Sequence, residues 1–147
     1  MAKQPEESSG FLLWQVTLRW RRQVTATLRP LGLTHVQFVL LASTWWLNTH
    51  DEEPSQAALS AFAGVDVKMA SQVIRTLESK GLVTRQVDAG DSRARRLVVT
   101  EAGAALAPRA IAAVEAVDDE LLVPLSRADA RAFIRALQQL RDAGAEG

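Results

Sequence analysis

The chain has 147 residues, the length of a single domain, and its 17 Lys and Arg residues balance its 17 Asp and Glu residues. It contains no cysteine, which excludes disulfides, thiolate metal sites and thiol redox switches, and two histidines are too few for a histidine-rich metal site. No apolar run reaches the roughly 20 residues of a membrane span, and the polar start lacks a signal-peptide core, so we expect a cytoplasmic protein without a metal or other cofactor.

Two helices are predicted at the start of the chain. The first runs from Gly10 to Leu28, because apolar residues recur on it in steps of three and four until Pro30 and Gly32 end it. The second begins after Thr34, which forms a capping-box pattern with the glutamine three residues later, and runs to about Leu47. A polar loop, NTHDEEP, follows at residues 48–54.

Residues 55–81 predict two short helices. Ser55 is the expected N-cap of the first, and Gly64 ends it. Asp66 is the expected N-cap of the second, and Gly81 ends that one. The side chains expected to be buried are Ala58, Leu59 and Phe62 in the first helix, and Ala70, Val73, Ile74 and Leu77 in the second. Two short helices joined by a tight turn form a helix-turn-helix.

A two-stranded hairpin is predicted next, with strands over Leu82–Val87 and Arg96–Thr100 and DAGDSRA at its tip. Residues 66–96 carry seven Lys or Arg against four Asp or Glu, so this part of a neutral chain is locally basic. A helix-turn-helix followed by such a hairpin is a winged helix. The expected fold is therefore mainly α, with a small two-stranded β-wing.

Two more helices are expected after the wing. Thr100 caps the first, which buries a stripe rich in small residues: Leu106, Ala110, Ala113, Val117 and Leu121. Pro108 should bend this helix or mark a local break. The acidic triplet Asp118-Asp119-Glu120 indicates a solvated face rather than a metal site. Ser126 starts the last helix, whose buried face is Ala130, Phe133, Leu137 and Leu140.

The helix over residues 66–80 carries the expected DNA contacts. Its exposed positions are Val67, Lys68, Met69, Ser71, Gln72 and Arg75. They offer donors, acceptors and methyl groups, and an α-helix fits the major groove of B-DNA with its first residues at the base edges. The alternative is a solvated helix face beside an ordinary hairpin.

Residues 55–103 carry a pattern in two parts, SQAALSAFAGVDVKMASQVIRTLESKGLVTR and DAGDSRARRLVVTEAG. Its marked positions are Leu77, Glu78, Lys80 to Val83, Arg85, Asp88, Asp91, Arg93, Thr100 and Gly103. With this pattern the chain resembles the multiple-antibiotic-resistance regulator (MarR) family of winged-helix repressors. The resemblance implies a sequence-specific, double-stranded DNA-binding transcriptional regulator.

The resemblance also gives the wing residues separate roles. Arg93 is expected to enter the minor groove from the wing tip, where a narrow groove concentrates negative potential. Asp91 is expected to orient an arginine, or simply to form the turn, since aspartate favours turns. Arg95 and Arg96 are placed to contact phosphates.

The remaining helices predict a homodimer, because their apolar stripes exceed what one small domain covers. The expected organisation is a single MarR-type domain over 1–147, with a winged-helix lobe at 34–103 and dimerisation helices at 1–33 and 104–147. Two-fold symmetry would place two recognition helices one DNA turn apart on a palindromic operator. The interface candidates are Leu12, Leu13, Val16, Leu121, Leu125, Phe133, Leu137 and Leu140. The alternative is a monomer with a helical cap.

Members of the MarR family often bind small aromatic anions, so the resemblance also implies a ligand. The candidate pocket residues are Trp14, Arg21, His35, Trp45 and Trp46, which would supply aromatic walls and a cation for a carboxylate. The alternative for each tryptophan is plain core packing.

These features predict a dimeric repressor released by a small aromatic or phenolic ligand. An enzyme is the competing class, but the sequence shows no nucleophile–base pair, no phosphate-binding glycine loop and no metal-ligand cluster, so none is expected. The other alternative is a winged-helix protein-interaction module that does not bind DNA.

Overall fold

The computed structural model describes residues 2–87, 90 and 95–145. These residues form a winged helix within a mainly helical chain, as the sequence predicts. The elements, in chain order, are η1 (Pro5–Glu7), α1 (Ser9–Leu28), η2 (Arg29–Leu31), α2 (His35–Thr49), α3 (Gln56–Ala63), α4 (Val67–Ser79), β1 (Val83–Val87), β2 (Arg95–Val99), α5 (Glu101–Leu122) and α6 (Arg127–Ala145).

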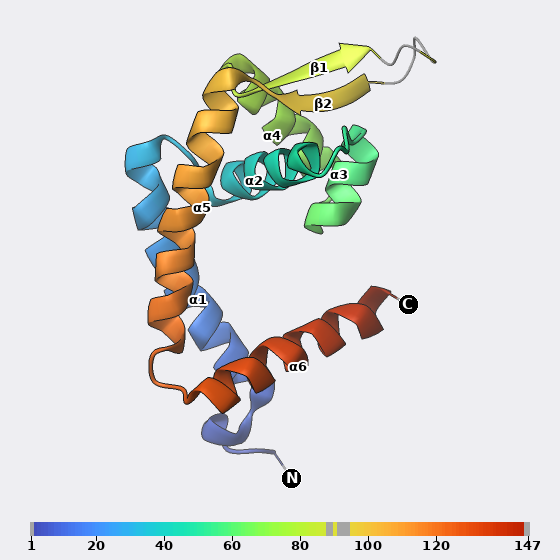
Figure 1. Cartoon of the computed structure of the whole chain (residues 1–147). Helices are drawn as coiled ribbons and strands as arrows, with labels where there is room; N and C mark the ends of the chain where they lie inside the picture. Colours follow the sequence, from blue (N-terminus) through green and yellow to red (C-terminus); the bar gives the residue numbers. More distant parts are fainter. Residues whose placement is uncertain (1, 88–89, 91–94, 146–147) are drawn as a thin grey trace.

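The long helices form a column that carries the winged helix at one end. Helices α1 and α5 pack side by side, and α5 also packs on α2 (Figure 1). Helices α2, α3 and α4 and the antiparallel β1–β2 sheet make up the lobe at the upper end of this column. Helix α6 leaves the lower end of α5 and extends away from it. The chain therefore has a compact lobe and a long, thinly covered helical part.

Side-chain caps fix where the helices begin. Thr34 and Gln37 form a complete capping box, in which each side chain accepts a hydrogen bond from the other residue's backbone N–H, both at 3.2 Å. The side chains of Ser55 and Thr100 accept hydrogen bonds at the starts of α3 and α5. Such caps satisfy backbone N–H groups that have no partner inside the helix. The predicted helix starts are confirmed for this reason.

The core lies where the lobe meets the column. Its fully buried large side chains are Val24, Leu28, Leu40, Leu41, Thr44, Leu59, Ile74, Leu77 and Leu97. On α1 only Val24 and Leu28 are buried, and no residue of α6 is buried. The upper column is therefore part of the core, while the lower column and α6 leave apolar side chains uncovered.

Three predictions about the lobe's helices need correction. In α3, Ala58 is exposed and Phe62 is 54% exposed, because the eight-residue helix turns only Leu59 and Ser60 inward. The second helix continues to Thr49, two residues beyond the predicted end.

Among the described helices none is long and apolar enough to cross a membrane alone, and α3 with α4 reaches that length only as a pair bent by 111°.

The wing and α5 also differ from the prediction in detail. The strands pair as Val83↔Val99 to Val87↔Arg95, so Leu82 and Thr100 lie just outside them. Helix α5 runs without a break through Pro108. The prediction of a solvated Asp118 is wrong, because its Oδ1 accepts a hydrogen bond of 2.7 Å from the indole N–H of Trp20 on α1.

Candidate nucleic-acid interface

The turn between α3 and α4 aims the start of α4 outward. Gly64 ends α3 with a φ of 71°, a left-handed conformation that costs glycine little. The backbone N–H of Val65 then donates to the Ser60 carbonyl, and the Ser60 hydroxyl donates back to the Val65 carbonyl. Asp66 caps α4 by accepting from the N–H groups of Lys68 and Met69, at 3.1 and 3.3 Å. The turn is thus fixed by hydrogen bonds on both sides.

Helix α4 has one buried and one exposed side. Ala70, Ile74 and Leu77 are buried at steps of four and three, which places them on one face. The six predicted contact residues lie off this face: Val67, Lys68, Met69, Gln72 and Arg75 are exposed, and Ser71 is half-buried. The structure therefore brings these six together on one continuous helix surface.

Lys68 and Arg75 are the two cations on this surface. No acidic side chain of the described residues forms an ion pair with Lys68 or Arg75. Arg75 instead donates from Nη2 to the Ser71 hydroxyl at 3.1 Å, which holds its guanidinium along the helix surface. The exposed Thr76, which the sequence reasoning missed, extends the same face by one turn. A phosphate approaching this face meets positive charge that is not already neutralised.

The predicted wing arginines have different surroundings. Arg95 is exposed and lies opposite Val87, at the end of the sheet next to the hairpin tip. The guanidinium of Arg96 donates to the Glu53 carbonyl at 3.1 Å, so it lies against the loop before α3. Arg93 and Asp91, the predicted tip residues, lie outside the described residues. Their roles stay predictions.

Asn48 attaches the wing to α2, which the sequence did not reveal because Asn48 reads as a loop residue. Its side-chain amide donates to the Leu97 carbonyl at 3.2 Å and accepts from the Val99 N–H at 2.9 Å. The N–H of Leu97 donates to the Pro54 carbonyl at 2.9 Å. The outer edge of β2 is therefore paired, and the wing is held at a fixed angle to the lobe.

The motif residues around α4 act as braces. Glu78 on α4 forms an ion pair of 2.7 Å with Arg85 on β1, which couples the helix to the wing. Lys80 donates from Nζ to the Gly32 carbonyl at 2.5 Å and to Gln37 Oε1 at 2.8 Å, which couples the end of α4 to the start of α2. These side chains position the exposed face of α4 rather than form part of it.

The five predicted ligand residues fall into separate groups. His35 and Trp46 lie at opposite ends of α2, roughly 16 Å apart along the helix. Trp46 stacks on His50 at 3.9 Å and faces Phe62 at 5.9 Å, while Trp45 packs against the core. Trp14 is 61% exposed on α1. Their role in ligand binding stays a prediction.

His35 lies where α1, α2 and α5 meet. Its ring meets the edge of Trp20, with centroids 5.0 Å apart. Burial lowers the pKa of His35 below its ordinary value, the charge of Arg21 lowers it further, and Asp118 acts in the opposite direction. His35 and Arg21 are thus neighbours, whereas Trp46 is not part of this group. Among the described residues no three His, Asp or Glu side chains group as a metal site requires.

Comparison with known proteins gives consistent results. The family model named MarR family matches residues 33–94. An uncharacterized HTH-type transcriptional regulator of Bacillus subtilis, YdcH, is 38% identical over 92% of this chain and 91% of its own. The HTH-type transcriptional repressor Rv2887 of Mycobacterium tuberculosis is 36% identical over 89% of this chain and 91% of its own.

Two solved structures of Rv2887 superpose on the chain. The complex with salicylic acid has a TM-score of 0.70 at 35% identity and covers 90% of this chain and 96% of the solved one. The complex with DNA also has a TM-score of 0.70 at 35% identity, and covers 90% and 97%. Both resemblances cover far more of the chain than the helix-turn-helix.

Proposed function

The chain belongs to the MarR family of transcriptional regulators, and we propose that it is a dimeric repressor that binds a palindromic operator and releases it on binding a small aromatic ligand. The observation that carries the DNA-binding part is the exposed face of α4. Lys68, Gln72 and Arg75 lie opposite its buried stripe, and Glu78 and Lys80 brace the helix against the wing and α2.

The chemistry of this face suits a major groove. Lysine and arginine contact phosphates or guanine, glutamine pairs with adenine, and the methyl-bearing Val67 and Met69 suit thymine. Both apolar side chains are exposed, at 60% and 46%, so they are accessible to a base edge. The related Rv2887 has been solved in complex with DNA, which supports DNA binding by this chain.

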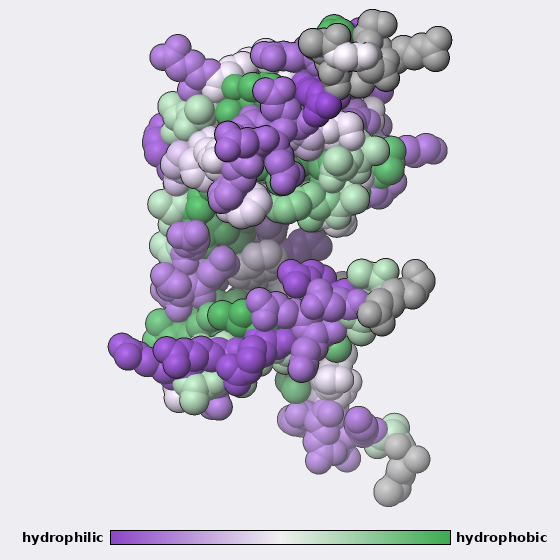
Figure 2. Space-filling view, turned by 45° about the vertical axis from the view of Figure 1, so that its right-hand side comes forward, coloured by the Kyte–Doolittle hydropathy of each residue, from purple (hydrophilic) through white to green (hydrophobic). Residues whose placement is uncertain are grey.

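The dimer is supported by the apolar side chains that a single chain leaves uncovered. On α1 the exposed ones are Phe11, Leu12, Leu13, Trp14 and Val16, and on and just before α6 they are Val123, Leu125, Phe133, Ile134, Leu137 and Leu140. Figure 2 shows α6 standing apart from the lobe, with its hydrophilic face toward the viewer and hydrophobic atoms along its edges. Large exposed apolar surfaces of this kind mark protein interfaces. A second copy of the same helices would cover them.

Release by an aromatic ligand is the third part of the proposal. Rv2887 has been solved with salicylic acid, and Arg21 beside His35 offers this chain a cation for a carboxylate. Such a ligand would lower DNA affinity by binding more tightly to a lobe spacing that no longer fits the operator. We expect salicylate to quench tryptophan fluorescence and to release DNA. If millimolar salicylate neither quenches the fluorescence nor releases DNA, another signal controls the repressor.

The DNA-binding part is tested by fluorescence anisotropy with labelled genomic fragments at several salt concentrations. Lys68→Ala and Arg75→Ala should each reduce the slope of log affinity against log salt by about one, because each removes one phosphate contact. Arg109→Ala is the matched control, since this exposed arginine on α5 lies outside α4 and the wing. A chain that binds no fragment would instead be a winged-helix protein-interaction module.

A further inference from the structure

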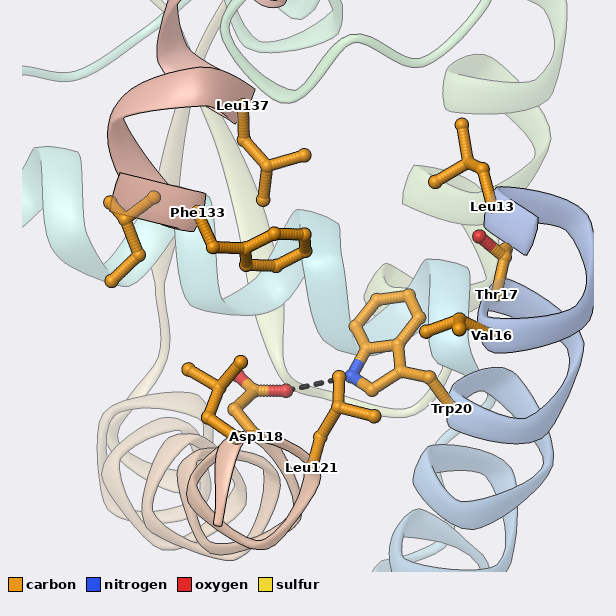
Figure 3. A pocket seen from close by; sticks show the side chains of 10 residues that line it. Leu13, Val16, Thr17, Trp20, Asp118, Leu121, Phe133 and Leu137 are labelled. Atoms are coloured by element: carbon orange, nitrogen blue, oxygen red, sulfur yellow. Dashed lines mark hydrogen bonds between the residues drawn. The ribbon is translucent and has the colours of Figure 1, made fainter. Parts of the chain in front are cut away.

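Asn48, in the last turn of α2, holds the outer edge of the wing. The long-range hydrogen bond between Trp20 and Asp118 joins two helices, α1 and α5 (Figure 3). Asn48 instead uses both ends of its amide on a β-strand. Its Nδ2 donates to the Leu97 carbonyl at 3.2 Å, and its Oδ1 accepts from the Val99 N–H at 2.9 Å. The side chain therefore bonds to β2 as the backbone of a neighbouring strand would.

The same residue shapes the loop that pairs with the next part of this edge. Asn48 Nδ2 also donates to the Glu52 carbonyl at 2.9 Å, which closes the turn after α2. Two residues further on, the Pro54 carbonyl accepts from the Leu97 N–H at 2.9 Å. Asn48 thus bonds to β2 directly and also sets the course of the loop that bonds to β2 beside it.

The wing depends on such support, because an isolated two-stranded hairpin is at best marginally stable. The ion pair between Arg85 and Glu78 ties β1 to α4, but its side chains are 28% and 32% exposed, and exposed pairs contribute little. Asn48 is half-buried, and its bonds lie on the other edge of the sheet, at β2. We therefore expect the Asn48 bonds to hold the wing more firmly than the ion pair does.

Support at the base of the wing decides where its other end lies. Val99 lies at the base, and Arg95 is exposed at the end of β2 next to the hairpin tip. The two residues are roughly 13 Å apart along an extended strand, so a tilt of about 10° at the base would move Arg95 by about 2 Å. A displacement of this size breaks a hydrogen bond between an arginine and a phosphate.

We propose that Asn48 is a positioning residue for DNA binding, which holds the wing where Arg95 reaches a phosphate of the operator while α4 occupies the major groove. This inference rests on the proposed function and adds to it a residue outside both α4 and the wing. Asn48 donates from Nδ2 to two carbonyls of the lobe, which uses both hydrogens of its amide. It therefore acts on DNA through the wing rather than by direct contact.

Double-mutant cycles measured by fluorescence anisotropy test this proposal on the labelled genomic fragment that the wild-type chain binds most tightly. Asn48→Ala should weaken binding at least tenfold. Arg95→Ala should weaken it too, but by a factor at least threefold smaller in the Asn48→Ala chain than in the wild-type chain, because the contact is already lost. Arg75→Ala, on α4, should cost the same affinity in both chains, since independent sites have additive effects.

Thr49→Ala is the matched control and should bind the fragment as the wild-type chain does. Thr49 is the next residue of α2, and its hydroxyl donates to the Trp46 carbonyl of the same helix at 2.7 Å. If Asn48→Ala does not fold, Asn48→Asp replaces it, because the carboxylate keeps the size and the acceptor but loses the donor. Thr49→Asp then controls for the added charge, and Asn48→Asp should bind at least fivefold more weakly than Thr49→Asp, with the same coupling to Arg95.

Three results would overturn the proposal: unchanged affinity of Asn48→Ala, unchanged affinity of Arg95→Ala, or equal coupling of Asn48 to Arg75 and to Arg95. Equal coupling would mean that the substitution loosens the whole lobe rather than the wing. In all three cases the wild-type chain still binds DNA, so the proposed function stands. A wild-type chain that binds no fragment would overturn the proposed function and this inference together.

Discussion

Gly103 shows how a single residue fixes the junction between the wing and the column. It lies in the first turn of α5, directly against the backbone of Leu82, and a Cβ at this position would lie 2.0 Å from the Leu82 carbonyl oxygen. The Thr100 hydroxyl accepts from the Gly103 N–H at 3.0 Å and donates to the Gly81 carbonyl at 2.6 Å. The closing threonine and glycine of the family motif are therefore packing residues.

Replacing Gly103 with alanine should lower the free energy of unfolding by about 2–3 kcal/mol, because backbone atoms must move to admit the methyl group. Gly10→Ala, in the first turn of α1 where nothing lies within 4 Å, should instead raise it by up to about 1 kcal/mol through helix propensity. Urea denaturation measures both. Similar changes in the free energy of unfolding for the two variants would show that the close contact with Leu82 does not determine the cost of a side chain at position 103.

His35 gives the chain a pH-dependent stability. Burial and Arg21 lower its pKa below 6.5 in the folded chain, so between that lowered value and 6.5 the unfolded chain binds more protons. Stability should therefore fall as the pH drops through this window, and be unaffected above it.

Thermal melting at pH 7.5 and 5.5 tests this at one residue. His35→Gln should show a smaller loss of Tm on acidification than the wild-type chain. His50→Gln, at an exposed position, is the matched control and should lose as much Tm as wild type. An identical pH response in His35→Gln and wild type would assign the acid sensitivity to other groups.

At the scale of the element, the sequence predicted helix starts and turns well because their causes are local. A cap such as Asp66 bonds to N–H groups two and three residues away, and the pattern is visible in the sequence. Contacts between distant segments were missed. Asn48 bonds to β2 and Trp20 bonds to Asp118, 98 positions away, and nothing in either residue's neighbours indicates its partner.

The same limit explains the error at Phe62 and the wide spacing of the predicted ligand residues. The periodicity of a short helix does not say how wide its covered face is, so Phe62 was placed inside. Residue type alone does not say where each tryptophan lies: Trp46 stacks near Phe62 and Trp45 packs on the core at one end of α2, while His35 lies at the other end.

Helix α6 provides a prediction at this scale, because its apolar face is uncovered in one chain. Leu140 is 69% exposed, so Leu140→Glu should cost a single chain little, yet it should weaken the dimer at least tenfold by placing a charge in the interface. Gln139→Glu, the neighbouring exposed position, is the control with the same charge. Sedimentation equilibrium measures both, and an unchanged association of Leu140→Glu would exclude this face from the interface.

At the scale of the whole molecule, the lobe and the column differ in how well their side chains are covered. The lobe has a packed core and a braced helix α4, which suit reading DNA without rearrangement. The column ends in α6, which has no buried residue in one chain and which the proposed dimer would cover. In a symmetric pair, the position of each lobe is set through α5, which packs on both α1 and α2. The spacing between the two α4 helices then follows from how two columns associate.

The most direct test selects bound sequences from random DNA and then measures how many chains bind each recovered DNA. Two α4 helices related by two-fold symmetry should recover an inverted repeat with half-site centres about 10 base pairs apart, bound by two chains. Recovery of sequences without a shared motif, or of a single half-site bound by one chain, would contradict a dimeric operator-binding regulator.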